Sequence, residues 1–423
     1  MSSVRLAILS DLHFFLKEDG STSAASHLPI DSDGDIWGPK RGPKKNPWDD
    51  LITLIQNEGL TADAIVCPGD ITTAANQTAL KTAWKSLNDL AIAMKAECLY
   101  VATGNQDVDS RSQKNRIDKN PIRELSNTMA PVEALKTLEP LYPYVRLTTG
   151  SEEERRNAQR RYFGESFVIA DHDPRYRVLI FNSCSEHGHD PFEYERGTTP
   201  ASSLRWIEKD LAKLSDQKIN ILVAHHPLIP QSSADGDSYS FQSRGDALIK
   251  VLGGHGDAWL ILNGHKHNGE VRNAPTGSGT PMTMFSSASF AAASDVVEGG
   301  YDNQFYIIDV ELSGDGTLHG KIRAWNWNVG HEWRPAPPGS NGGGIFDGCG
   351  FGSKLSAKQI ADKVSDLVMA GTDEWPKIRG QIEELMFVMP DALRAAFRIL
   401  EKNHGLKTEY GSEGFFTRVV KKA

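Results

Sequence analysis

Five short motifs with carboxylate, amide and imidazole side chains lie far apart along this chain. Imidazole nitrogens together with carboxylate and amide oxygens form a ligand set that suits Mn²⁺, Fe²⁺ or Zn²⁺ better than Mg²⁺ alone. Each motif by itself is weak, because spacings such as D-x-H and H-x-H arise by chance. Five of them in order indicate one shared metal site: Asp11-Leu12-His13, Gly69-Asp70, Gly104-Asn105-Gln106-Asp107, His225-His226-Pro227 and Gly264-His265-Lys266-His267.

Each motif directly follows a short run rich in Val, Ile and Leu, which predicts a buried strand. In open α/β sheets, ligand sites form at the carboxyl ends of the strands, so placement and chemistry agree. Residues alternate across a strand, so we expect Asp11 and His13 to point the same way. The predicted strands are residues 4–9, 64–67, 99–102, 178–181, 219–224 and 259–262.

Helical patterns lie between some of these strands, at residues 83–94 and 204–214. Strand–helix alternation favours an α/β layered fold. Later apolar runs, at residues 282–285, 305–310 and 321–325, lack long helices between them. We expect these later runs to form a second sheet.

Composition divides the chain into a main domain, a linker and a small C-terminal module. Residues 1–333 contain the motifs and two long polar insertions, at about 14–47 and 109–161. Residues 334–354 are rich in Pro and Gly, which predicts a linker. The pattern Ser356-x-x-Gln359 predicts a capping box that opens a helical module over residues 355–423, and its basic end at 418–422 is expected to be a solvated tail.

The bulk composition is that of a globular protein in a reducing compartment. The net charge of −9 gives no general attraction for nucleic acid. Four cysteines lie far apart without a C-x-x-C pair, which favours a cytoplasmic location over a disulfide framework. No apolar run approaches about 18 residues, so we expect no membrane span.

Taken in order, the five motifs resemble those of the calcineurin-like metallophosphoesterase family, over residues 4–267. The resemblance implies a two-sheet α/β sandwich that holds two divalent metal ions, with Asp70 bridging them. Manganese is favoured, and Fe²⁺ or Zn²⁺ would also suit the site. Matched motif by motif, one ion would take Asp11, His13 and His267, and the other Asn105, His225 and His265.

A weaker similarity points to the branch of the family that contains cyclic-nucleotide phosphodiesterases. It runs from Arg161-Tyr162-Phe163 through Gly197, Trp206 and Leu211. Two cations would lower the pKa of a bridging water, neutralise phosphate charge and align the attacking and leaving oxygens. We therefore expect a phosphodiesterase that acts on a nucleotide through a metal-bridging hydroxide.

One position departs from the family pattern, which usually has histidine where this chain has Gln106. Glutamine donates a hydrogen bond but supplies no proton near neutral pH. Three outcomes stay open: Gln106 only slows the enzyme, another group such as His226 or the His187/His189 pair replaces the histidine, or the site binds ligand with little turnover. The expected catalytic residues are Asp70, Asn105, Gln106 and His226, with Asn105 and Gln106 also binding substrate.

Two other functions remain as alternatives. A metal-dependent nuclease acting on DNA or RNA would use basic clusters on the insertions to form a groove. A low-turnover nucleotide or metal sensor would dock a protein partner on residues 355–423. Solvated surface is the simpler reading of the basic clusters, which are Lys40, Arg41, Lys44 and Lys45 beside Trp37 and Trp48, and Arg155, Arg156, Arg160 and Arg161.

Overall fold

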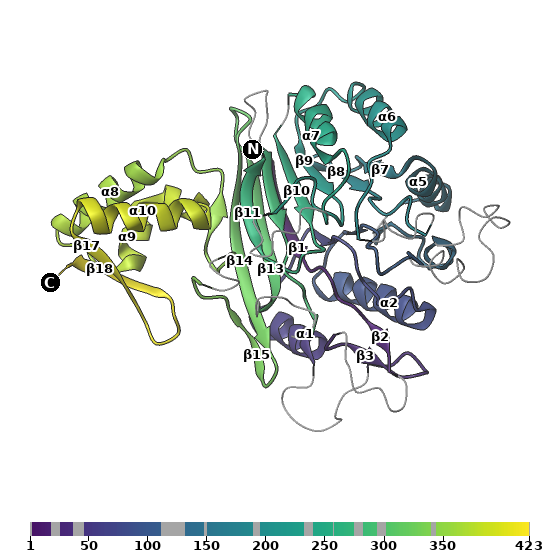
Figure 1. The fold of residues 1–423 in the computed structure, drawn as a ribbon, viewed down its shortest axis with the longest axis horizontal. Coiled ribbons are helices and arrows are strands. Elements are labelled where there is room, and N and C mark those ends of the chain that lie inside the picture. The colour runs from purple at the N-terminus through teal and green to yellow at the C-terminus, as the bar shows by residue number, and fades with distance from the viewer. Residues whose placement is uncertain are drawn as a thin grey trace.

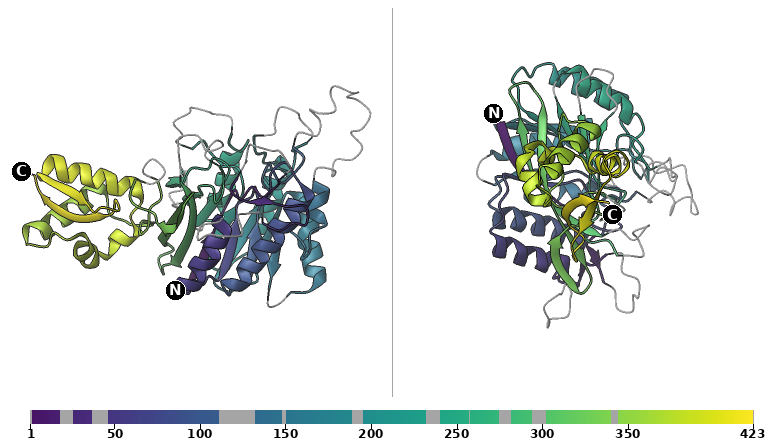
Figure 2. Two further views of the ribbon diagram at one scale, coloured as in Figure 1. Left: turned by 90° about the horizontal axis from the view of Figure 1, so that it is seen from below. Right: turned by 90° about the vertical axis from the view of Figure 1, so that its left-hand side faces the viewer.

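The computed structural model describes residues 2–17, 26–36, 46–110, 132–147, 150–188, 195–231, 240–256, 258–274, 282–293, 302–339 and 344–422. Within these residues two sheets pack against each other, and helices cover the outer face of each (Figures 1 and 2). The predicted two-sheet α/β sandwich is therefore confirmed. No helix in the described ranges is both long and apolar enough to cross a bilayer.

The first sheet combines strands from the beginning and the end of the main domain. Its order is β15-β14-β13-β1-β4-β5-β6, with β16 also pairing with β14. β1, β4 and β5 run parallel, and β13 pairs antiparallel with β1. The bounds are β1 Ser2–Ile8, β4 Ala64–Cys67, β5 Cys98–Val101, β6 Tyr144–Arg146, β13 Asn303–Leu312, β14 Leu318–Asn328, β15 His331–Pro335 and β16 Gly350–Phe351.

The second sheet has the order β11-β12-β10-β9-β8-β7, in which β8, β9, β10 and β12 run parallel. Its inner strands β9 and β10 are buried along their whole length, as expected for parallel strands covered on both faces. The bounds are β7 Phe167–Ala170, β8 Tyr176–Phe181, β9 Ile219–Val223, β10 Trp259–Asn263, β11 Glu270–Ala274 and β12 Met282–Ser286.

The expectation that the later runs form a sheet of their own is wrong. β13 and β14 extend the first sheet, whereas β12 joins the second one. The physical reason is pairing over long distances: Val4 of β1 lies opposite Val310 of β13. Such a partner is not indicated by the local pattern of either strand.

Helices on the outer faces bury apolar stripes against the sheets. Ile207 and Leu211 of α6 pack with Leu248 and Leu252 of α7 on the second sheet. α1 begins where the Asn46 side chain accepts a hydrogen bond from the Asp49 N–H, a typical N-cap. The bounds are α1 Pro47–Glu58, α2 Gln77–Ala93, α4 Glu133–Lys136, α5 Glu152–Glu165, α6 Ala201–Leu211 and α7 Gly245–Gly254.

Both long insertions contain regular structure in their described parts. The first contributes the short parallel pair β2 (Phe15–Leu16) and β3 (Pro29–Ile30). The second contributes α4, β6 and most of α5. The predicted helical character of the second insertion is thus partly met, and β6 adds an edge strand to the first sheet.

The C-terminal module projects from one end of the sandwich, beyond β14 (Figures 1 and 2). Its first helix opens with the predicted capping box between Ser356 and Gln359. The expected solvated tail is wrong, because residues 416–421 form a strand paired with 406–410. The bounds are α8 Ala357–Met369, α9 Trp375–Gln381, η3 Glu383–Phe387, α10 Pro390–Asn403, β17 Leu406–Tyr410 and β18 Phe416–Lys421.

The segment expected to be a linker is partly folded against the first sheet. β15 extends to Pro335, and β16 pairs with β14. Ala336, Ile345 and Phe346 are buried, and the ring centroid of Phe346 lies 5.9 Å from that of Phe416 in the module. This packing ties the module to the sheet edge.

Candidate metal centre

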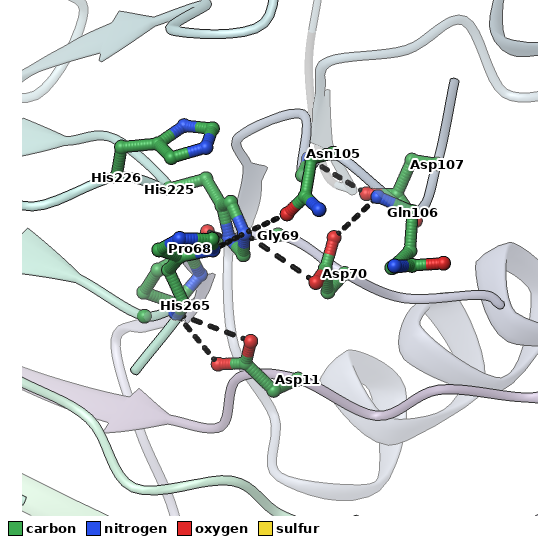
Figure 3. A network of polar contacts seen from close by, with 12 residues as sticks. Asp11, Pro68, Gly69, Asp70, Asn105, Gln106, Asp107, His225, His226 and His265 are labelled. Carbon is green, nitrogen blue, oxygen red and sulfur yellow. Dashed lines mark hydrogen bonds and ion pairs between the residues drawn. The ribbon is translucent and has the colours of Figure 1, made fainter. Parts of the chain in front are cut away.

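The carboxyl ends of strands from both sheets meet at one place, and all five motifs lie there (Figure 3). The first sheet contributes the motifs after β1, β4 and β5, and the second contributes those after β9 and β10. Backbone hydrogen bonds hold the motifs together, from Asp11 N–H to Gly69 O (3.0 Å) and from Gly264 N–H to His225 O (3.1 Å). The His265 N–H donates to the Asp11 carboxylate at 3.1 Å and so joins the two sheets.

One group of side chains consists of Asp11, His13 and His267. The Nε2 atoms of His13 and His267 are 3.1 Å apart, and His267 Nε2 lies 3.4 Å from Asp11 Oδ1. Asp70 Oδ2 lies 4.0 Å from His13 Nε2. Asp11, His13 and His267 form one of the groups whose ligand atoms lie close enough together to hold an ion.

A second group consists of Asn105, His225 and His265. His225 Nε2 lies 2.9 Å from Asn105 Oδ1 and 3.2 Å from His265 Nδ1. The same Asp70 oxygen that faces His13 lies 3.4 Å from His225 Nε2. Asp70 therefore stands between the two groups, as a shared ligand must.

The separations fit metal ligation. Atoms bound to one ion at about 2.1 Å, at angles of 90–110°, lie roughly 3.0–3.4 Å apart. The nitrogen–nitrogen distances of 3.1 and 3.2 Å match that spacing. All seven predicted ligands are thus brought together as two sets of nitrogen and oxygen atoms around Asp70.

Five of these ligand residues adopt left-handed backbone angles, with φ of 51–77°. Non-glycine residues rarely adopt such angles, and they cluster where function fixes the backbone. Strand alternation is therefore the wrong reason for the common direction of Asp11 and His13, because β1 ends at Ile8 and both residues lie in the loop after it. The residues are Asp11, His13, Asp70, His265 and His267.

Glycines allow the motifs to approach one another closely. A Cβ atom at Gly104 would lie 2.0 Å from Asp70 Oδ1, and one at Gly264 would lie 2.5 Å from Asp11 Oδ2. Gly69, at φ 107°, would meet Gly104 N at 2.8 Å. A side chain at any of these positions would push a ligand out of place, which explains the glycine in three of the five motifs.

Asp107 is a buried residue of the site for which the sequence predicted no role. Its carboxylate accepts hydrogen bonds from the N–H groups of Gly104 (2.8 Å) and Thr72 (2.9 Å). It thereby fixes the loops that carry Asn105 and Asp70. Its place directly after Asn105-Gln106 was the available signal, since a carboxylate three residues after a turn glycine commonly bonds back to the backbone.

The buried carboxylates of Asp11 and Asp70 favour a positive charge in the centre. Burial by itself would raise the pKa of Asp70, but His225 and its other neighbours hold that pKa below its ordinary value. Burial lowers the pKa of His225, but Asp70 and Asp11 outweigh burial and raise it to about 9. Two buried carboxylates therefore attract a cation, and a proton on His225 partly meets this demand when no metal is bound.

His225 is held in the orientation that a metal ligand needs. Its Nδ1 lies 2.9 Å from the carbonyl oxygen of Pro68, which can only accept. Nδ1 therefore carries a proton, and the lone pair of a neutral ring is on Nε2, the atom that faces Asp70 and Asn105.

Gln106 lies at the edge of the centre, partly exposed (Figure 3). Its side-chain Oε1 accepts a hydrogen bond from the Ala74 N–H at 3.2 Å. That contact leaves the amide Nε2 as the donor available to a substrate oxygen.

His226 and His187 lie behind the metal ligands rather than in front of them. His226 is fully buried, its ring centroid is 4.4 Å from that of His265, and its Nδ1 lies 2.8 Å from Ser183 Oγ. Burial holds its pKa well below the ordinary value, so it is a poor proton donor. His187 is also buried, where it contacts Ser110 and the Arg196 carbonyl, so it does not lie on a solvated loop; His189 lies outside the described residues.

Two residues of the segment that weakly resembles the cyclic-nucleotide branch contact the loops behind the site. Tyr162 of α5 accepts a hydrogen bond from the Thr103 N–H at 2.8 Å, just before Gly104. A Cβ atom at Gly197 would lie 2.7 Å from the His226 side chain. Both residues fix the loops behind the ligands.

The structure describes the basic cluster on α5 but not the one at residues 40–45. Lys40, Arg41, Lys44, Lys45 and Trp37 lie outside the described residues. On α5, Arg156 pairs with Glu152, and Arg161 pairs with Glu165 and Asp210. These ion pairs favour the reading of the α5 cluster as helix surface.

Comparison with known proteins gives structural matches only. No protein-family model matches the sequence, and no curated protein matches it. A candidate 5′-nucleotidase of Staphylococcus aureus shares 10% identity and a TM-score of 0.37, with 75% of this chain and 52% of that chain covered. The NAD nucleotidase NadN of Haemophilus influenzae shares 10% and a TM-score of 0.37, with 78% and 53% covered.

A third structure, the sulfate thiohydrolase SoxB of Thermus thermophilus, shares 13% identity and a TM-score of 0.33, with 76% of this chain and 56% of that chain covered. This chain thus spans about half the length of each of the three structures. Similarity at this level indicates neither an activity nor a substrate.

Proposed function

We propose that this chain is a dinuclear metal-dependent phosphohydrolase, and that it cleaves phosphodiester bonds in a nucleotide. The observation that carries the proposal is the position of Asp70 Oδ2, 3.4 Å from His225 Nε2 and 4.0 Å from His13 Nε2. A carboxylate oxygen shared by two groups of nitrogen ligands is what a pair of adjacent cations requires.

The residues divide between holding the ions and binding the substrate. Asp11, His13 and His267 would hold one ion, Asn105, His225 and His265 the other, and Asp70 both. Two divalent cations supply charge neutralisation for the phosphate and an activated water. Manganese remains the favoured metal, and Fe²⁺ or Zn²⁺ also suits nitrogen and oxygen ligands.

Gln106 and Asn105 are the proposed substrate-binding residues. The free Nε2 donor of Gln106 is available to a phosphate oxygen, and Asn105 presents its amide beside His225. His226, which we expected among the catalytic residues, suits the role of a positioning residue, because it is buried against His265 and is held by Ser183.

A nucleotide is favoured over a nucleic acid by charge. The net charge of −9 disfavours a polyanion, and two arginines of the α5 cluster are engaged in ion pairs. The weaker similarity to the cyclic-nucleotide branch points the same way.

The proposal is tested by metal analysis together with a substrate screen. The purified protein should retain divalent metal and, with Mn²⁺, should hydrolyse bis(p-nitrophenyl) phosphate, whose leaving group needs no acid. Cyclic nucleotides, mononucleotides and short DNA then separate the substrates. Turnover of DNA with steep salt dependence would support the nuclease, whereas metal and nucleotide binding without turnover under every divalent metal would support the sensor.

A further inference from the structure

A cavity of about 630 Å³ lies where the C-terminal module meets the loop before β16. This volume is within the range typical of small-molecule sites, and junctions between structural units are a common place for them. None of its lining residues belongs to the metal centre. The residues that give it chemical character are Phe346, Trp375 and Phe416, with Arg379, Asp347 and Glu383.

The apolar part of the wall is aromatic. The ring centroids of Trp375 and Phe416 are 5.6 Å apart, and those of Phe346 and Phe416 are 5.9 Å apart, both in edge-on arrangements. Such rings present faces and edges against which a flat, apolar group packs well. Phe346 and Trp375 are nearly buried in the module junction, so the wall is fixed by packing on its far side.

Arg379 is the residue of the cavity wall whose N–H donors are only partly engaged by contacts with described residues. Its Nη2 donates to the Gly348 carbonyl oxygen, and a Cβ atom at Gly348 would lie 2.5 Å from its Nη1. Among the described residues it forms no ion pair with a carboxylate within 4.0 Å, although Asp347 lies close enough to act through space. A guanidinium has five N–H donors in a planar fork that matches a carboxylate. Partial burial of the guanidinium lowers its pKa from the ordinary value.

We propose that this cavity binds a small planar aromatic carboxylate, with the carboxylate on Arg379 and the ring against Trp375 and Phe416. Asp347 and Glu383 on the same wall make a multiply charged anion unfavourable. The ligand would contact α9 and the loop before β16 together, so it should stabilise the junction between the module and the first sheet.

The test uses 2-naphthoate and its neutral, nearly isosteric amide, 2-naphthamide, with the full-length protein. Isothermal titration calorimetry should show saturable one-to-one binding of 2-naphthoate and at least tenfold weaker binding of 2-naphthamide. Arg379→Gln should weaken 2-naphthoate binding at least tenfold. Arg394→Gln removes an exposed arginine of α10 that pairs with Asp391, and it should leave binding unchanged.

A second variant keeps the test decisive if Arg379→Gln does not fold. A Cβ atom at Gly380, which lines the cavity, meets no atom within 4 Å, so Gly380→Leu should fold and place a bulky side chain at the cavity wall. Loss of 2-naphthoate binding in Gly380→Leu supports the proposal. Absence of saturable binding to the wild type, or equal affinity in the folded Arg379→Gln and Gly380→Leu variants, overturns it.

Discussion

Asp70 Oδ1 accepts a hydrogen bond from the backbone N–H of Gln106 at 2.8 Å, and this contact turns Oδ2 toward the histidines (Figure 3). The loop that carries Gln106, the proposed substrate-binding residue, is thereby attached to the carboxylate that stands between the two groups of side chains. Moving Asp70 should therefore also shift Gln106, and moving Gln106 should shift Asp70. We therefore expect substrate orientation and metal retention to be coupled through this contact.

Asp70→Asn should remove both metal and activity. The amide keeps the shape of the side chain but lacks the charge that balances two cations. We expect a loss of roughly 10³-fold or more in the hydrolysis of bis(p-nitrophenyl) phosphate, since even outer partners of metal ligands cost 10–100-fold. Mass spectrometry of bound metal and initial rates measure the two effects. The control is Asp89→Asn, an exposed carboxylate paired with Lys85, which should change neither quantity.

Gln106→His should accelerate reactions with poor leaving groups most. A histidine at the edge of the centre can protonate a leaving alkoxide, and such help is typically worth roughly 10²–10⁴-fold. The p-nitrophenolate leaving group needs no proton, so its rate should change little. Rates on an alkyl ester and an aryl ester of the same phosphate measure the difference. An equal change in both rates would contradict this account of Gln106.

The convergence of the candidate metal ligands could be predicted from the sequence because its signal is local. Each ligand follows an apolar run that forms a parallel strand, and parallel strands share the edge at which their carboxyl ends lie. His225 and His265, for example, each lie two residues after the end of their strand, β9 and β10. The structure places the five motifs side by side, and that they hold metal ions stays a prediction.

Features that depend on distant partners could not be predicted in the same way. β13 belongs to the first sheet because its residues pair with β1, about 300 positions earlier. Asp70 adopts a left-handed angle, and although Asp and His are enriched at such angles, the residue type alone does not predict one. The β17–β18 hairpin was missed because its strands are half exposed and carry many charges.

Removing the metal should make stability fall as pH rises above neutral. The carboxylates raise the pKa of His225 against the effect of burial, from 6.5 to about 9. Because this folded-state pKa is raised, the proton stabilises the fold fully below pH 6.5, and that contribution is lost as pH rises through about 9. Burial and Asp70 raise the pKa of Asp107 to about 8, so its contribution is lost in the same direction, through about pH 8.

We therefore expect the melting temperature of chelator-treated protein to fall between pH 6.5 and pH 9, with His225 contributing at most roughly 3 kcal/mol. Saturating Mn²⁺ should replace the proton, so the stabilisation by metal should grow with pH over the same range. Calorimetry at several pH values measures both trends. The His225→Asn variant should show a shallower fall without metal. A flat or rising melting temperature in the chelated wild type would contradict the prediction.

Gly104→Ala should disrupt the centre although it adds only one methyl group. The new Cβ atom would lie 2.0 Å from Asp70 Oδ1 and 2.2 Å from the Asp70 backbone nitrogen, and the backbone there cannot yield without moving the ligand. We expect loss of bound metal, loss of hydrolysis and a lower melting temperature. The matched control is Gly164→Ala in α5, where a Cβ atom meets no atom within 4 Å. This control should be neutral, or stabilising by about 0.5–1 kcal/mol, because alanine favours a helix interior. Full metal content and normal rates in Gly104→Ala would mean that Asp70 is not packed against this glycine, and the shared-ligand assignment would lose its structural basis.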